Sequence, residues 1–240
     1  MGCQNHIAPN NIDIDPDVDI SVLAYSEEQA YEKKGVARFI VKYQTYFWFP
    51  LLTITAFSKR FSLFRILMHN LVSKRWKSYV TDLTFLMVGT VLLYGLIFHF
   101  LGISKGVVFV LVNQALVGLY LGTIFATNHK AMPLMKEEIG FTEAQILTTR
   151  SVKANPLISF WCVGLNYQIE HHLFPTMPRN NFAKAQKIVK PFCNEIGIEY
   201  YETGFFQSYK EILQNFHNVS AVLRKPKVVG LAKPVITNST

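Results

Sequence analysis

Residues 83–103 read LTFLMVGTVLLYGLIFHFLGI, and residues 106–127 read GVVFVLVNQALVGLYLGTIFAT. Neither segment contains a charged residue, and only a few residues, among them Lys105, separate the two. Each segment reaches the roughly 20 apolar residues that an α-helix needs to cross about 30 Å of hydrocarbon. The pair therefore predicts a tight transmembrane hairpin whose two outer ends lie on the same side of the membrane.

The chain before the hairpin is basic and aromatic. Residues 58–79 contain six basic residues and no acidic one, so the positive-inside rule predicts that they lie in the cytoplasm. The outer ends of the hairpin and both termini are then expected to be cytoplasmic as well. Residues 37–57 are rich in aromatic side chains, but Lys42, Gln44 and Pro50 interrupt the apolar run. A helix in the membrane interface, or a re-entrant one, fits this pattern better than a span.

The composition also indicates an integral membrane protein. Half of the 240 residues are hydrophobic and only 17% are charged, whereas about a quarter are charged in soluble domains. The formal net charge is +8, but the sequence has neither zinc-finger spacing nor the aromatic signature of RNA-binding domains. We therefore exclude nucleic acid as a partner and expect anionic lipid beside the basic surface.

The motif QIEHH, residues 168–172, is a candidate metal site. On a helix, Gln168, His171 and His172 lie on neighbouring positions of one face, whereas Glu170 points away and could at most support the ligands through hydrogen bonds. Imidazole binds iron, copper or zinc, and a carboxamide oxygen suits iron. A histidine pair that caps a helix or binds phosphate is the alternative, and the spacing alone does not choose between them.

The hairpin determines which other histidines can join this pair. His129 lies at the cytoplasmic mouth of the second span, and His6 precedes the hairpin on the same side. His99 lies in the first span, roughly 24 Å from its cytoplasmic end at 1.5 Å per residue, and cannot reach the others. His69 and His217 lie on amphipathic stretches and are expected at the surface.

Three motifs carry a family resemblance. Residues 168–179, QIEHHLFPTMPR, resemble the third histidine box of the membrane fatty acid desaturases, in the front-end and acyl-lipid branch where Gln replaces the first histidine. Residues 125–133, FATNHKAMP, resemble the family segment with an additional metal histidine after the last span. Residues 2–6, followed by IAPNNIDIDPDVDI, are similar to the second box, with His6 at its last histidine and Asn5 where the family has histidine. The family's first box is absent.

The resemblance implies a di-iron centre, with molecular oxygen as co-substrate. The metal ligands that it carries over to this chain are His6, His129, Gln168, His171 and His172. It implies no catalytic residue beyond these ligands and no other cofactor site. Five ligands are too few to complete two iron sites. We therefore expect an incomplete centre in an N-terminally truncated member of the family.

By resemblance, the chain is expected to be the C-terminal part of an oxygen-dependent fatty acyl desaturase, which introduces a double bond into a fatty acyl chain. The implied partners are a fatty acyl lipid or acyl thioester, membrane lipid, and a separate b-type cytochrome or ferredoxin, because the sequence has no haem-binding HPGG motif. Asn128 is expected to support the ligands. The alternatives are a non-catalytic membrane remnant that binds no metal and a histidine-ligated haem electron carrier.

The predicted fold is all-α, with a two-helix transmembrane hairpin, an interfacial helix and a cytoplasmic helical cap that carries the histidine-box ligands. The expected divisions are a polar loop with the remnant of the second box (1–35), the interfacial helix and basic segment (36–79), the hairpin (80–127), the cap with the third box (128–224) and a loose tail (225–240).

Overall fold

The computed structural model describes most of the chain as helices. The described residues are 10–11, 18, 20–70, 76–135 and 139–224, and His6 lies outside them. The helices are α2 (Glu27–Glu32), α3 (Gly35–Lys42), α4 (Gln44–Thr53), α5 (Thr55–Asn70), α6 (Trp76–His129), α7 (Phe141–Leu147), α8 (Pro156–Trp161), α9 (Gln168–Leu173), α10 (Phe182–Glu195), α11 (Phe205–Val219) and α12 (Ala221–Arg224), with the 3₁₀ turn η2 (Arg179–Asn181).

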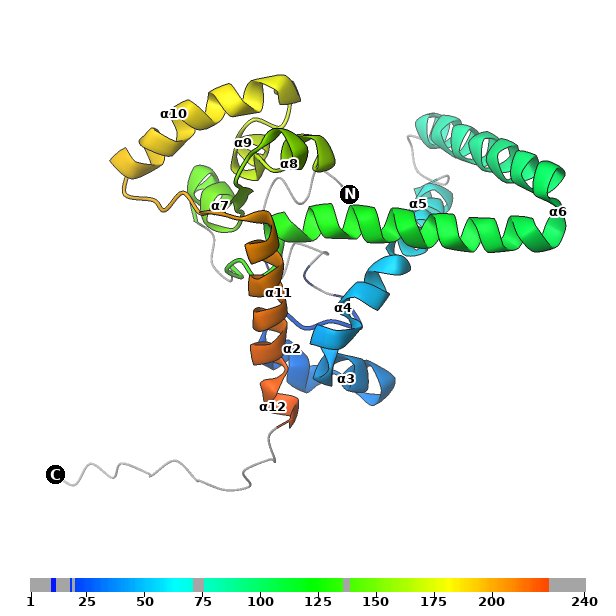
Figure 1. The fold of residues 1–240 in the computed structure, drawn as a ribbon, viewed down its shortest axis with the longest axis horizontal. Helices are drawn as coiled ribbons and strands as arrows, with labels where there is room; N and C mark the ends of the chain where they lie inside the picture. Colours follow the sequence, from blue (N-terminus) through cyan, green and yellow to red (C-terminus); the bar gives the residue numbers. More distant parts are fainter. Residues whose placement is uncertain (1–9, 12–17, 19, 71–75, 136–138, 225–240) are drawn as a thin grey trace.

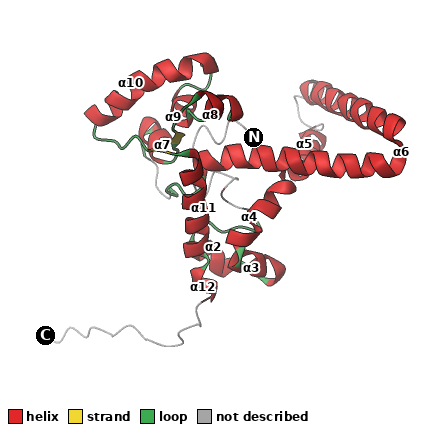
Figure 2. Ribbon diagram, in the orientation of Figure 1, coloured by secondary structure: helices red, strands yellow, loops and turns green. Residues whose placement is uncertain are grey.

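Helices dominate the described residues, as the sequence predicts for an all-α protein (Figure 2). The strands β1 (Ser151–Val152) and β2 (Glu202–Thr203) have two residues each and pair in parallel, with Ser151 opposite Glu202. This short pair joins the segment after α7 to the segment before α11. It therefore ties together two ends of the cap and does not form a sheet layer.

Helix α6 bends back on itself at Gly102. The backbone there has φ 71° and ψ 174°, a non-helical conformation that glycine adopts without the clash a Cβ would cause. Figure 1 shows the two arms on either side of this residue, 76–101 and 103–129, running in opposite directions from the turn. A Cβ on Gly106 would lie 2.5 Å from the Phe98 ring, so the arms touch beside the turn. The break falls at the end of the first predicted apolar segment.

Helix α4 packs closely against the second arm. Cβ atoms placed on Gly118 and Gly122 would lie 2.6 Å from the Leu52 carbonyl oxygen and 2.6 Å from its side chain. These two glycines are four residues apart on one face of the helix, the small-xxx-small spacing that lets helix backbones approach in membranes. The spacing is visible in the sequence, although its partner is not.

The predicted interfacial segment is divided among α3, α4 and the start of α5. Gln44, one of the residues that interrupt its apolar run, is fully buried. Its amide nitrogen donates to the carbonyls of Ala24 and Phe216 at 3.1 and 3.2 Å, and its oxygen accepts from the Ala24 N–H at 3.0 Å. Gln44 is therefore an internal link between α4 and α11, and its polarity is satisfied inside the protein.

Helix α5, which begins the basic segment, also contacts the hairpin. The Arg60 guanidinium donates to the Tyr94 hydroxyl at 2.8 Å and lies 5.5 Å from the centre of that ring. Tyr94 is in the first arm of α6. The sequence did not predict this contact, because composition alone treats the basic segment and the hairpin as separate elements.

Three hydrophobic cores hold the remaining described helices, and the third of them joins α2, α3 and α12 around Ala30, Val41 and Leu223. The first lies where α4, the second arm of α6 and α11 meet, around Trp48, Ala126 and Phe216. The second lies inside the cap, where Ile146 of α7, Ile169 of α9 and Val189 of α10 pack together. Figure 1 shows the cap helices gathered around the C-terminal end of α6.

Arg150 joins the end of α6 to α11, and it is completely buried. Its guanidinium donates to the carbonyls of Thr127 and Lys130, the latter at 2.8 Å, and to Glu211 Oε2 at 2.5 Å. Its backbone N–H donates to the carbonyl of Asn128 at 3.1 Å. Burial lowers the pKa of the Arg150 guanidinium, and the Glu211 charge opposes that shift. One arginine thus satisfies the carbonyls that the end of a helix leaves without partners.

We expect Gly118→Ala to destabilise the protein by about 1–3 kcal/mol, because the added methyl group meets backbone atoms of α4 that cannot move aside. Thermal unfolding in detergent, followed by circular dichroism, measures the effect. Gly89→Ala is the control, since its Cβ would meet nothing within 4 Å. Equal melting temperatures for the two variants would show that α4 does not pack against the second arm.

We expect Arg150→Met to cost about 3–5 kcal/mol of stability, because it leaves Glu211 and two helix-end carbonyls without their buried partner. Lys190→Met is the control. Lys190 forms a half-exposed ion pair with Glu202 at 2.9 Å, and losing such a pair costs about 1 kcal/mol or less. Chemical denaturation of both variants in the same detergent compares them, and similar losses would contradict the role of Arg150.

Candidate metal centre

The QIEHH motif forms the short helix α9, the conformation assumed in placing its side chains on one face. The helix ends at Leu173 because Phe174, with φ −131° and ψ 66°, precedes Pro175 and leaves the helical region. Ile169 is fully buried in the cap core between α7 and α10. That anchor sets the rotation of α9, which directs the neighbouring polar side chains toward the end of α6.

His129 and His172 meet although they are 43 residues apart in the chain. Their Nε2 atoms lie 3.3 Å from each other, and their ring centres are 4.9 Å apart at 64°. Two nitrogens bound to one metal ion with bonds of about 2.1 Å would be about 3.0–3.4 Å apart at angles between 90° and 109°. The separation therefore falls within the range for two ligands of a single ion, and it is also the length of a hydrogen bond between the two rings.

Gln145 determines which nitrogen of His172 faces His129. Its Oε1 lies 2.7 Å from His172 Nδ1, so Nδ1 carries the proton and donates, and Nε2 keeps its lone pair toward His129. Both residues are buried. Metal-binding histidines are usually held in this way. Gln145 could not be predicted from the sequence, because its place on α7 carries no spacing signal that relates it to α9.

Gln168 contacts the His129 ring of this pair. Its amide nitrogen is 2.9 Å from His129 Nε2, and its Oε1 accepts a hydrogen bond from Asn128 at 2.9 Å. Asn128 also donates to the Leu165 carbonyl at 3.0 Å, which sets the orientation of its amide. The carboxamide oxygen, the atom expected to bind iron, is thus engaged by Asn128. To act as a ligand, this oxygen must use its second lone pair or the amide must rotate.

His171 lies beside His129 and His172 but points in a different direction from His172. Its ring centre is 5.8 Å from that of His172 and 5.8 Å from that of Phe182. Neighbouring positions on a helix diverge by about 100°, so two adjacent histidines suit two metal ions better than one. Of the five predicted ligands, the structure brings His129, Gln168 and His172 together, places His171 next to them, and does not describe His6.

The described residues fit one metal ion only in part. Within the described ranges, no group of three or more His, Cys, Asp or Glu side chains is arranged to hold a metal. His129 and His172 supply two nitrogen donors at ligand spacing, and Gln168 supplies an amide in contact with His129. A second ion would need His171 together with donors from outside the described residues.

Glu170 turns away from the histidines, as the helix geometry predicts. It is buried, and the Tyr200 hydroxyl donates to its Oε1 at 2.8 Å while Ser151 Oγ lies 3.5 Å from its Oε2. Burial raises the pKa of Glu170, and the hydrogen bond from Tyr200 opposes that shift. Glu170 therefore joins α9 to the segment before β2 and holds the helix from its back.

The remaining described histidines lie apart from this centre. His69 and His217 are exposed, in agreement with their prediction as surface residues. His99 is exposed near the Gly102 turn and contacts Phe100, with ring centres 5.0 Å apart. It lies three residues before that turn, whereas His129 is at the other end of the second arm.

Comparison with known proteins identifies a family and several relatives. The model of the family "Fatty acid desaturase" matches residues 4–204. An acyl-lipid (9-3)-desaturase of Physcomitrium patens is 33% identical over 231 residues, which cover 90% of this chain and 42% of that protein. Fatty acid desaturase 3 of Bos taurus is 28% identical over 224 residues, covering 88% and 47%.

A third relative, a delta(6)-fatty-acid desaturase of Caenorhabditis elegans, is 37% identical over 118 residues, which cover 48% of this chain and 27% of that protein. The chain thus spans less than half the length of these relatives. No solved structure matches it. Because the family model covers most of the 240 residues, the chain belongs to the fatty acid desaturase family.

Proposed function

We propose that this chain supplies the part of an oxygen-dependent fatty acyl desaturase that carries the third histidine box. The observation that carries the proposal is the meeting of His129 and His172, from the end of α6 and from α9, with 3.3 Å between their Nε2 atoms. The proposed metal ligands are His6, His129, Gln168, His171 and His172. In this proposal, the donors that complete a di-iron centre come from residues outside those described.

When bound, the iron centre supplies the oxygen chemistry that removes hydrogen from an unactivated methylene group. The described residues prepare the site for it. Gln145 holds the lone pair of His172 Nε2 toward His129, and Asn128 holds the Gln168 amide beside the His129 ring. Ile169 and Glu170 anchor α9 from behind, through the cap core and through Tyr200.

The proposal includes two membrane crossings by α6. The apolar helix Tyr79–His129 has 51 residues and a mean hydropathy of 2.1, and a straight helix of that length would measure about 77 Å, more than twice the hydrocarbon thickness. The turn at Gly102 divides it into two arms of suitable length. Both outer ends, the cap and both termini would then be cytoplasmic. The proposed divisions of the chain are the same as those expected from the sequence, with boundaries after residues 35, 79, 127 and 224.

The proposed substrate is a fatty acyl chain, carried as a lipid or as an acyl thioester, and the co-substrate is oxygen. Electrons would come from a separate b-type cytochrome or ferredoxin. Three relatives are named acyl-lipid (9-3)-, delta(6)- and delta(8)-desaturases. The delta(6) and delta(8) names give different bond positions, so the relatives support the substrate class and leave the position in the chain open.

Loss of a ligand should abolish metal binding. We expect the protein to bind iron when it is purified in detergent and titrated with iron(II) without oxygen. Loss of a hydrogen bond that supports a ligand lowers metal affinity by about 10–100-fold. We expect His172→Ala, which removes the ligand itself, to lower the iron affinity by more than this. Equilibrium dialysis with elemental analysis measures the bound iron. His217→Ala, an exposed histidine on α11, should bind as the parent does. A parent chain that binds no iron would favour the non-catalytic remnant.

Loss of the Gln145 acceptor should weaken the same site less severely. We expect Gln145→Leu to reduce iron affinity by about 10–100-fold, because His172 loses the partner that fixes its tautomer. Gln145→Glu keeps an acceptor at this position and should restore most of the affinity. Gln214→Leu, an exposed glutamine on α11, is the control, and equal affinity for it and Gln145→Leu would contradict the role of Gln145.

A further inference from the structure

Helix α8 presents a row of apolar side chains that no other described part of the protein covers. Leu157 is 72% exposed, Phe160 81% and Trp161 45%. Val163, directly after the helix, is also exposed. A soluble cap would hide such side chains, and a contiguous exposed patch of this kind marks a surface that contacts another phase or another molecule.

Residues at both ends of α8 fix the helix in place. Asn155 caps its first turn by accepting the Ile158 N–H at 2.8 Å, and Pro156 occupies the first helical position. After the helix, Val163 has φ 53°, a conformation that is costly for a β-branched residue. Arg179 donates to the Val163 carbonyl at 3.2 Å and holds this turn in place. The direction of the exposed face is therefore set by the surrounding structure.

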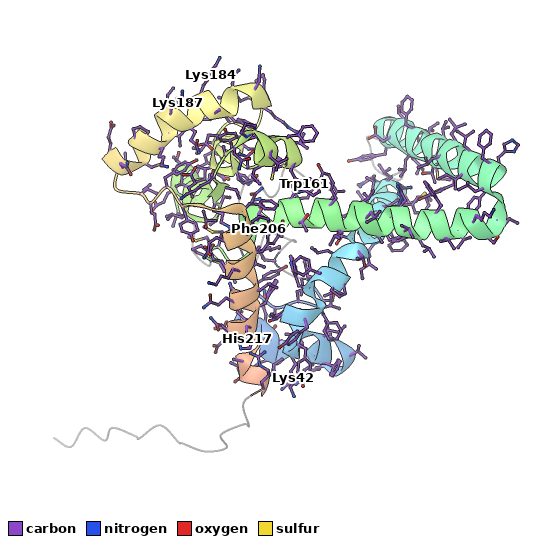
Figure 3. The ribbon with its side chains drawn as sticks, in the orientation of Figure 1. Lys42, Trp161, Lys184, Lys187, Phe206 and His217 are labelled. Carbon is purple, nitrogen blue, oxygen red and sulfur yellow. The ribbon has the colours of Figure 1, made fainter. Side chains whose placement is uncertain are left out.

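Helix α8 touches α6 at a definite level of the second arm. The Tyr120 hydroxyl donates to the Trp161 carbonyl at 2.9 Å, and the two rings meet edge to face with centres 5.0 Å apart. Figure 3 shows Trp161 beside this arm. Tyr120 is seven residues before Thr127, the end of the second predicted apolar segment. Seven residues of helix measure about 10 Å. Interfacial helices bury their apolar face about 5–10 Å into the headgroup and acyl boundary.

Helix α4 meets the same turn of the arm from another side, where Leu52 lies against Gly118 and Gly122. The exposed side chains of the arm continue the apolar surface at this level, among them Leu121 and Phe125. The face of α8 is therefore continuous with the apolar surface of the hairpin. The occupant that fits a surface shared by both is the hydrocarbon of the membrane.

The charges around α8 favour the same partner. Glu170 is the one acidic residue between Glu143 and Glu195, and it is buried. Lys153 precedes the helix and Arg179 contacts the turn that follows it, and both are exposed. Exposed aromatic and aliphatic side chains beside cations, without exposed anions, are the pattern that binds the headgroup region of an anionic leaflet.

We propose that α8 lies in the cytoplasmic leaflet, with Leu157, Phe160 and Trp161 among the acyl chains and Lys153 and Arg179 at the headgroups. Because α9 follows α8 after a short turn, this contact would hold the QIEHH helix at the membrane surface. The inference rests on the proposed crossing of the bilayer by α6, and it does not depend on metal binding.

Added tryptophans can report the depth of each position. The variants are Phe160→Trp on α8, Val112→Trp on the exposed surface of the second arm, and Ile188→Trp on α10. Ile188 is 73% exposed, which matches Leu157, and α10 lies on the side of the cap away from the arm (Figure 1). Each full-length variant is placed in vesicles of phosphatidylcholine and phosphatidylserine. The quenchers are lipids brominated near the carbonyl end of the acyl chain and aqueous iodide, and the emission of the parent protein is subtracted.

We expect bromolipid to quench the added emission of Phe160→Trp at least about twice as strongly as that of Ile188→Trp. We expect iodide to quench the added emission of Ile188→Trp more strongly than that of Phe160→Trp. Quenching of Val112→Trp but not of Phe160→Trp by bromolipid would overturn the inference while the crossing by α6 stands. Protection of Phe160→Trp from both quenchers would assign the face to protein and would equally overturn it. Absence of bromolipid quenching in all three variants would reject the crossing and the inference together.

Discussion

The attachment of the end of α6 to the cap depends on one buried cation. Arg150 binds the carbonyls of Thr127, Asn128 and Lys130 through its side chain and backbone. His129 lies within this group of residues. A helix end left without partners would fray or take up water, and His129 would move with it. By satisfying these carbonyls and pairing with Glu211, Arg150 holds one half of the candidate metal centre at a fixed place.

The other half is held by side chains that approach from three directions. Gln145 comes from α7, Asn128 from α6 and Tyr200 from the segment before β2, and each hydrogen-bonds a residue of α9. Each of these contacts is buried at one end or at both. Buried polar groups are costly when left unpaired, so a network in which they satisfy one another favours a single arrangement. The two histidine nitrogens are therefore brought to ligand spacing by the protein itself.

Helices α4 and α8 are held against the second arm of α6 by close packing and by a hydrogen bond. Glycines at 118 and 122 let α4 approach the second arm, and Tyr120 on the same turn receives α8. Both contacts lie within one turn of α6 and about two turns from His129. In the proposed crossing of the bilayer by α6, these contacts would fix the level of α4 and α8 relative to the membrane.

Much of this could be predicted from the sequence because it depends on local pattern. The length and apolar character of residues 83–127, the helix at QIEHH and the surface positions of His69 and His217 follow from periodicity and composition, and the family follows from short motifs. The partners of these motifs could not be found in this way. Gln145, Arg150 and Tyr200 stand 20 or more residues from the groups that they support, and nothing in their neighbourhood marks them.

What the sequence alone determined is thus which residues are candidate metal ligands and which segments are apolar enough for lipid. Only the tertiary structure decided that the Nε2 atoms of His129 and His172 meet while His171 lies beside them. It also decided that the oxygen of Gln168 accepts a hydrogen bond from Asn128 and that the apolar face of α8 stays exposed. The physical reason is that burial and hydrogen-bond satisfaction are properties of the whole packed molecule, which no window of neighbouring residues contains.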